Sequence, residues 1–176
     1  MRKYLYFVLA LMIFSIIHEG IHAFLALVFK EYQTVVIHPY GLEVIYKTSV
    51  TAREGIKWAF ISGLPNVVTL ALGYSLFLNM MQTTSIQKSL AHILLYVTVL
   101  LMLGDAFNLS VGPFIYGGDI NGISKGVGVN RYIIQSIFFI VLLLNRELLV
   151  QKLLPVYGIK TKHPLFYSWK KLKKDK

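Results

Sequence analysis

The chain has 176 residues and no cysteine, and 56% of its residues are hydrophobic. With a mean hydropathy of +0.61, this composition indicates an integral membrane protein of about four spans and excludes an ordinary soluble domain. The lack of cysteine excludes disulfides and cysteine-ligated metal sites. The formal net charge is +10. Because the excess sits largely in the C-terminal tail, it indicates contact with anionic lipid and no nucleic-acid partner.

The first apolar run covers residues 4–29 and contains the motif His18-Glu19-Gly20-Ile21-His22. Residues four apart share one face of a helix, so His18 and His22 can bind one zinc ion together. Glu19 can then act as general base toward a water activated by the metal. The alternative is a buried polar cluster that joins two helices. Ionisable groups in a bilayer-length segment are costly and usually functional, which favours the metal site.

Arg2 and Lys3 precede this run, so the N-terminus resembles a signal peptide. The run is longer than the apolar region of a signal peptide, and no small-residue cleavage site is evident after it. We therefore expect a first span that is retained.

Two β-rich runs follow, at residues 34–37 and 42–46, and turn-forming residues 38–41 lie between them. This pattern predicts a β-hairpin, in which we expect Val44 to face outward. Thr51 and Glu54 have the spacing of a helix N-cap and its partner, so we expect a surface helix that starts there and continues into the second span.

Three further apolar runs predict spans at about residues 58–78, 91–109 and 132–144, and the last of them can continue past residues 145–147. The second span contains Ser62-Gly63-Leu64-Pro65-Asn66, where small residues permit close helix contact and the asparagine needs a buried partner. A Gly/Pro-rich segment at residues 110–122 ends the third span. Such backbone is tolerated where it lines a protein cavity, which is also where a metal site needs its third ligand. The tail from residue 160 contains seven lysines and three aromatic residues, a composition typical of the membrane interface.

Three motifs, in this order, resemble those of the site-2 proteases, a family of intramembrane zinc metalloproteases. The first is the HEGIH motif at residues 18–22, and the second is residues 62–66, which resemble the family's Gly-Pro-Asn motif. The third runs from Asn108 through Pro113 to Asp119 and resembles the family's Asn…Pro…Asp-Gly element. The predicted hairpin also matches the family's membrane-associated strands, so the resemblance covers about residues 4–145. The chain departs from the family where two residues separate Asp119 from Gly122, and where the gap between Asn108 and Pro113 is longer.

We expect an all-α integral membrane protein, a multi-pass protein of the cell membrane, with about four transmembrane helices and a membrane-associated β-hairpin between the first two. The resemblance implies a catalytic domain over residues 1–150, followed by a basic, aromatic tail over residues 151–176. It implies that a transmembrane or membrane-associated peptide is hydrolysed, and that the substrate is a membrane-embedded peptide or a single-span protein. The lipid bilayer is the other expected partner. Whether a second copy of the chain or a regulatory protein also binds stays open. The implied site residues are His18, His22 and Asp119 as ligands of one zinc ion, Glu19 as general base, and Asn66 and Asn108 as substrate contacts.

Several alternatives remain open. A catalytically inactive zinc-binding membrane protein, with an immunity, scaffold or regulatory role, would show the same histidine motif. A soluble-type zincin would use a downstream carboxylate such as Glu43, which lies in a strand-like run and not on a helix. A proton-coupled transporter would also use intramembrane histidine and acidic residues, but no inverted repeat is visible. Asp105 competes with Asp119 as third ligand, although its run is helical and its simplest role is a hydrogen bond to a neighbouring helix. The Lys and Arg distribution leaves the orientation open.

Overall fold

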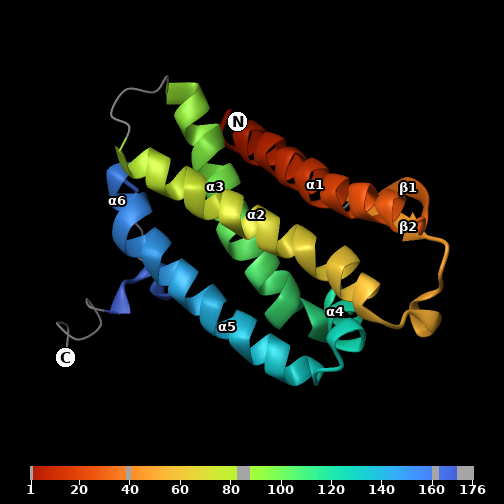
Figure 1. The fold of residues 1–176 in the computed structure, drawn as a ribbon. Helices are drawn as coiled ribbons and strands as arrows, with labels where there is room; N and C mark the ends of the chain where they lie inside the picture. The colour runs from red at the N-terminus through yellow and green to blue at the C-terminus, as the bar shows by residue number, and fades with distance from the viewer. Residues whose placement is uncertain (1, 39–40, 83–87, 160–162, 170–176) are drawn as a thin grey trace.

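The computed structural model describes residues 2–38, 41–82, 88–159 and 163–169. It is mostly helical, and four of its helices are long and apolar enough to cross a membrane. They are α1 (Arg2–Val28), α2 (Ile56–Gln82), α3 (Lys88–Ser110) and α5 (Arg131–Leu148). Figure 1 shows these helices packed as one bundle, in which α3 contacts each of the other three.

The last long helix continues past residues 145–147, in agreement with the longer of the two predicted extents. A π-helical turn (Leu149–Leu153) carries α5 on into the short helix α6 (Leu154–Val156). Arg146 then donates to the backbone carbonyls of Leu165 and Tyr167, which fastens the segment at residues 163–169 to this end of the bundle. The remaining parts of the predicted tail, residues 160–162 and 170–176, lie outside the described residues. The division of the chain near residue 150 stays a prediction.

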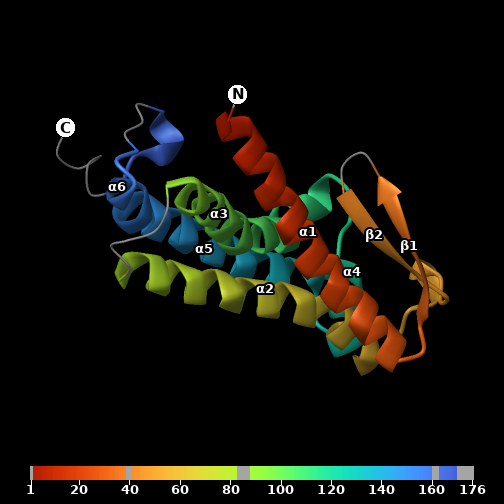
Figure 2. The same ribbon diagram turned by 90° about the horizontal axis from the view of Figure 1, so that it is seen from above.

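The predicted hairpin is confirmed as β1 (Tyr32–His38) paired antiparallel with β2 (Gly41–Tyr46). Pro39 and Tyr40, from the expected turn, lie outside the described residues. Figure 2 shows the hairpin beside the C-terminal half of α1, with β2 nearer the helix. The expectation that Val44 faces outward is wrong, because this residue is buried against α1 and only 4% exposed.

The predicted helix start at Thr51 is also wrong. Residues Val50–Ala52 form a single 3-10 turn, and α2 begins only at Ile56. Gly55, directly before α2, has φ +84°, a left-handed conformation that glycine adopts without strain. The chain therefore changes direction between the hairpin and α2 instead of entering the helix smoothly.

A short helix, α4 (Ile120–Val127), follows the 3-10 turn Gly112–Phe114. It packs closely on α2, because a Cβ at Gly122 would overlap the Ser62 side chain and one at Gly126 would overlap the backbone of Ala59. These two glycines, four residues apart, share one face of α4. The close contact places Asp119, at the start of α4, beside the middle of α2.

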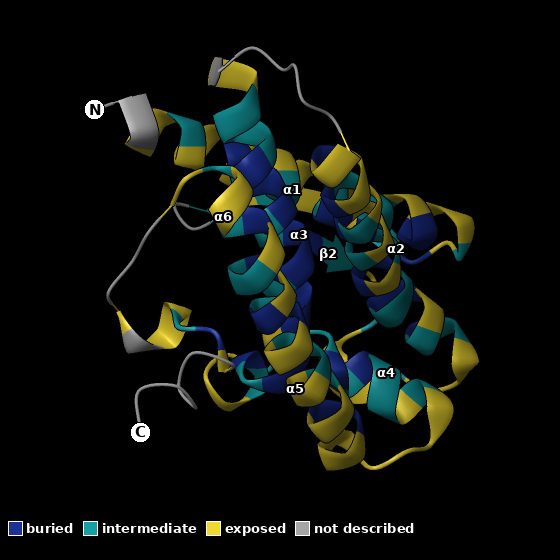
Figure 3. Ribbon diagram, turned by 90° about the vertical axis from the view of Figure 1, so that its left-hand side faces the viewer, coloured by how far each residue is buried: buried dark blue, intermediate teal, exposed yellow. Residues whose placement is uncertain are grey.

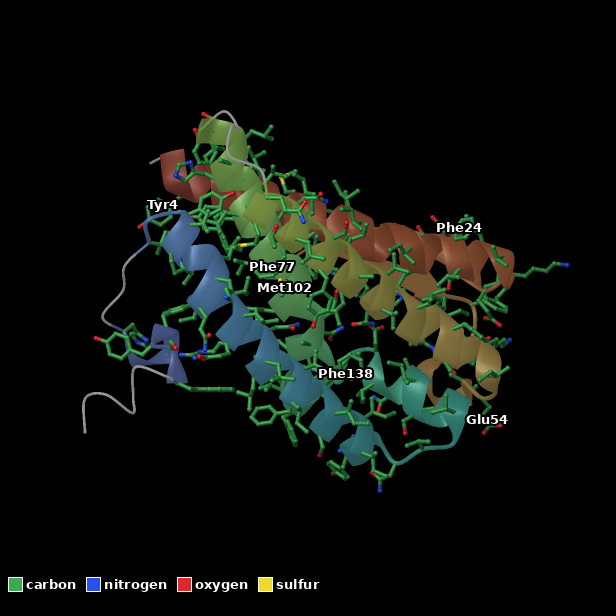
Figure 4. All side chains as sticks on the ribbon, turned by 60° about the vertical axis from the view of Figure 1, so that its left-hand side comes forward. Tyr4, Phe24, Glu54, Phe77, Met102 and Phe138 are labelled. Atoms are coloured by element: carbon green, nitrogen blue, oxygen red, sulfur yellow. The ribbon has the colours of Figure 1, made fainter. Side chains whose placement is uncertain are left out.

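Buried residues line the inside of the bundle (Figure 3), and many large apolar side chains are exposed on its outside. Between α2 and α3, Phe77 and Met102 point toward one another in the largest apolar cluster (Figure 4). By contrast, Ile16 and Phe24 on α1 are 56% and 63% exposed. Such a surface suits contact with lipid chains better than contact with water.

Candidate metal centre

One face of α1 carries the polar residues of the first motif. His18 and His22 lie one helical turn apart and are both buried, and Glu19 lies beside them on the side of the hairpin. The two histidine Nε2 atoms face each other at 3.1 Å. The helical spacing predicted from the sequence is therefore the spacing that brings these rings together.

Asp119 completes a triangle of ligand atoms. Its Oδ2 lies 3.5 Å from His18 Nε2 and 3.4 Å from His22 Nε2. Ligands bound tetrahedrally to zinc at about 2.0–2.1 Å are separated by about 3.3 Å, so the triangle has the dimensions of one metal site. In the part of the chain that the structure describes, this is the one cluster of histidine and acidic residues with such geometry.

A second contact orients each histidine. His18 Nδ1 lies 3.0 Å from Asp105 Oδ1, although the pair is not well aligned for a hydrogen bond. The Thr69 hydroxyl donates to the other oxygen of Asp105. His22 Nδ1 lies 3.0 Å from the Tyr46 hydroxyl on β2. Because the Nδ1 atoms face Asp105 and the Tyr46 hydroxyl, both Nε2 atoms point at the centre of the triangle, as metal-binding histidines require.

The two predicted substrate-binding asparagines both contact Asp119. Asn66 Nδ2 and Asn108 Nδ2 each donate to Asp119 Oδ2 at 3.0 Å. The Tyr116 hydroxyl in turn donates to Asn108 Oδ1 at 2.9 Å. These contacts give both asparagines a role in positioning the carboxylate, and their contact with a substrate stays a prediction.

The electrostatic surroundings of Asp119 favour its ionised form. Burial alone would raise the pKa of this carboxyl, but the neighbouring His22 and His18 rings lower the pKa well below its usual range. A carboxylate must be deprotonated to bind a metal. The ionised carboxylate is the form that binds a metal, and the two histidines must also be unprotonated at their Nε2 atoms to bind it with Asp119.

The outer edge of β2 faces this site. Glu19 Oε2 accepts the Val44 N–H at 3.2 Å, and Ser15 Oγ accepts the Leu42 N–H at 3.3 Å. Alternate N–H groups of an edge strand point away from its partner strand. In β2, two of these outward groups are therefore bound by side chains of α1, one of which is the predicted general base.

A cavity of about 1450 Å³ lies between α1 and β2 and reaches the ligand triangle. Its lining includes Ser15, Glu19, Asp119, Leu42, Tyr46 and Arg53. Pockets for small molecules commonly have volumes of about 300–1,000 Å³. This cavity is larger and follows a strand edge, so it has room for a stretch of extended peptide.

The other two candidate ligands lie elsewhere. Glu43 is exposed on the hairpin, where its Oε2 lies 2.8 Å from His38 Nε2. Asp105 contacts the His18 nitrogen that points away from the triangle. The structure thus brings Asp119, and neither alternative carboxylate, to the converging histidine nitrogens.

Sequence reasoning predicted that Asp105 contacts a neighbouring helix, which is confirmed, but it did not name His18 as the partner, and it overlooked Tyr46. Asp105 lies three residues before Asn108, and this spacing on one helix face was the available signal. No comparable signal exists for Tyr46, because its contact depends on how β2 aligns with α1.

Comparison of the chain with known protein families, curated proteins and solved structures finds no match. The three motifs and the arrangement of their side chains are therefore the basis for any functional conclusion.

Proposed function

We propose that this chain is an integral protein of the cell membrane, with α1, α2, α3 and α5 as transmembrane helices and the hairpin at the membrane. This proposal is supported by four helices that are long enough to cross a membrane and that carry apolar side chains on their outer faces. The polar side chains of these helices turn inward, where His18, Asp105 and Asn66 find partners in the bundle. This is the arrangement that a bilayer imposes.

The proposed activity is that of an intramembrane zinc metalloprotease similar to the site-2 proteases. The observation that carries it is the convergence of His18 Nε2, His22 Nε2 and Asp119 Oδ2 beside the Glu19 carboxylate in a cavity of peptide size. Two imidazoles and one carboxylate suit zinc better than magnesium or calcium, which prefer oxygen ligands. When bound, zinc supplies a Lewis acid that activates water and polarises a peptide carbonyl.

The remaining chemistry belongs to the residues of the chain. Glu19 takes the proton from the attacking water and passes it to the departing amine. Asp105 and Tyr46 keep the two histidines in position, and Asn66 and Asn108 do the same for Asp119. An extended substrate pairs with the outer edge of β2, where its carbonyls replace Ser15 and Glu19 at the Leu42 and Val44 N–H groups. Substrate binding therefore also releases the Glu19 carboxylate for catalysis.

Metal analysis of the purified protein, paired with a cleavage assay on membrane-spanning peptides, tests this function. We expect one zinc ion per chain and cleavage within the spanning segment. A folded protein that binds no zinc would refute the metal centre. A protein that binds zinc and cuts none of the peptides would support the alternative of an inactive zinc-binding membrane protein.

A further inference from the structure

Arg53 lies in the segment between the hairpin and α2 and lines the same cavity as Glu19 and Asp119. Its guanidinium carbon lies 4.7 Å from the ring centres of both Tyr46 and Trp58. Its Nε donates to the Thr48 carbonyl at 3.4 Å. Stacking on two rings, which are themselves packed edge to face, fixes the plane of the guanidinium.

Within the described part of the chain, no carboxylate forms an ion pair with this cation. Among the described residues, none of the ion pairs includes Arg53. Glu31 is already paired with Lys57 at 2.5 Å and accepts from Thr48 at 2.7 Å. Asp119 is bound to the two histidines and the two asparagines described above. The side chain is half-buried, and this burial lowers the pKa of Arg53.

A guanidinium nevertheless keeps its charge in proteins. Apart from the Nε bond to Thr48, no described residue accepts a hydrogen bond from Arg53. A partly dehydrated cation with unused terminal N–H groups therefore faces the cavity.

Arg53 also occupies a defined place along the cleft. The α1 residues Ser15 and Glu19 face Leu42 and Val44 of β2, and His22 contacts Tyr46 at the end of that strand. Arg53 stacks on the ring of the same Tyr46. It thus lies one tyrosine ring away from a metal ligand, at the end of the cleft and just before α2 begins.

We propose that Arg53 is a carboxylate-binding subsite that recognises an acidic group on the peptide bound along β2. The group is an acidic side chain or a free C-terminal carboxylate a few residues from the scissile bond. This inference rests on the proposed peptide-cleaving function. A fixed guanidinium binds a carboxylate through two parallel N–H···O hydrogen bonds, an interaction that partial exclusion of water strengthens.

Peptides that carry a terminal hydroxamate, a zinc-chelating group, test the subsite at a known distance from the metal. Two series, with the hydroxamate at either end, have Glu or Gln at successive positions. Their binding to zinc-loaded wild-type protein in phosphatidylcholine-containing micelles is measured by calorimetry. At one position we expect Glu to bind roughly 10- to 100-fold more tightly than Gln. A matched series with free or amidated C-termini separates a terminal carboxylate from a side-chain carboxylate.

Arg53→Gln should abolish the preference for the acidic peptide while affinity for the Gln peptide stays the same. Arg53→Lys should retain only part of the preference for the acidic peptide, because the charge remains but the bidentate geometry is lost. Arg131→Gln is the matched control, since Arg131 stacks on Tyr132 at 4.9 Å and is not part of the cavity lining. This control should keep the full preference. If Arg53→Gln does not fold, the wild-type scan and Arg53→Lys still decide the question.

A wild-type preference below about twofold at every position would overturn the subsite, as would a preference that survives in Arg53→Gln. If the wild type shows no preference but binds added phosphatidylglycerol more tightly than Arg53→Gln does, the site takes lipid phosphate and the proposal is wrong. If the hydroxamates bind without a preference for Glu, the subsite is refuted but the proposed metal centre is not. Protein that binds neither zinc nor hydroxamate would overturn the proposed function as well.

Discussion

Asp105 and Asp119 approach His18 from its two different ring nitrogens, and this difference separates their roles. Asp119 lies on the Nε2 side, where the ligand atoms converge, and Asp105 lies on the Nδ1 side. Asp119→Ala should therefore lose zinc as completely as His18→Ala. Asp105→Asn should keep zinc but bind it roughly 10- to 100-fold more weakly, because an outer partner of a ligand is changed.

Competition with a chelator of known zinc affinity measures both variants. Asp105→Asn retains the size of the side chain, so the protein should stay folded and the comparison remains interpretable. Normal zinc binding in Asp119→Ala, together with loss in Asp105→Asn, would reverse the two roles.

At this scale, helical periodicity was sufficient to predict that His18 and His22 share a site. Asp119 was predicted from its place in the Gly/Pro-rich segment and from the family resemblance, and the structure positions it beside both histidines. The contacts of Tyr46 and Arg53 could not be predicted in the same way. Both depend on the alignment of β2 and of the segment before α2 with α1, which is a property of the folded chain.

Among the elements, the hairpin offers a direct test of substrate pairing. Leu42→Pro removes an N–H group that faces α1, and cleavage should weaken while zinc content stays normal. Ile37 is the matched control, since it lies opposite Leu42 and is 81% exposed. Its own N–H points away from both β2 and α1. Ile37→Pro should therefore leave the cleavage rate near that of wild type. If both prolines changed the cleavage rate equally, the hairpin would be a structural connector and not a substrate-binding edge.

The contact of α4 with α2 predicts a different outcome for two glycines. Gly122→Ala would push α4 away from Ser62, which should destabilise the protein by about 1–3 kcal/mol and weaken zinc binding through Asp119. Gly20→Ala is the control, because a Cβ there meets nothing within 4 Å and alanine favours a helix. Denaturation in detergent and zinc titration measure both effects. An unchanged zinc affinity in a destabilised Gly122→Ala protein would show that α4 does not position Asp119.

Glu31 joins the start of the hairpin to the start of α2 through Lys57. The hydrogen bonds from Lys57 and Thr48 lower the pKa of Glu31 in the folded protein. A glutamate in the unfolded chain titrates at about pH 4.3. The stabilisation is therefore fully present above that pH and is lost as the pH falls through the lower folded-state pKa.

Melting temperatures of wild type and Glu31→Gln should accordingly differ most near neutral pH and converge in acid. Glu54→Gln is the control, because Glu54 points away from the bundle and forms no ion pair with any described residue (Figure 4). A difference between wild type and Glu31→Gln that grows on acidification would contradict the assigned direction.

For the molecule as a whole, local patterns predicted the elements better than their junctions. Long apolar runs indicated four helices, and alternating β-rich runs indicated a hairpin, because each signal is contained in a single segment. The start of α2 was placed at Thr51 on the basis of a capping pattern, whereas the backbone conformation of Gly55 delays the helix to Ile56. The short helix α4 was not predicted either, since it depends on packing against α2 through Gly122 and Gly126.

Glu19 is the one residue expected to be essential for the chemistry and dispensable for binding of the metal. Wild type and Glu19→Gln are reconstituted in lipid vesicles, and the cleavage rate of a membrane-spanning peptide is measured beside the zinc content. We expect Glu19→Gln to retain one zinc ion per chain and to cut the peptide roughly 10²- to 10⁴-fold more slowly than wild type. Cleavage by Glu19→Gln at close to the wild-type rate, with zinc bound in both proteins, would contradict the account.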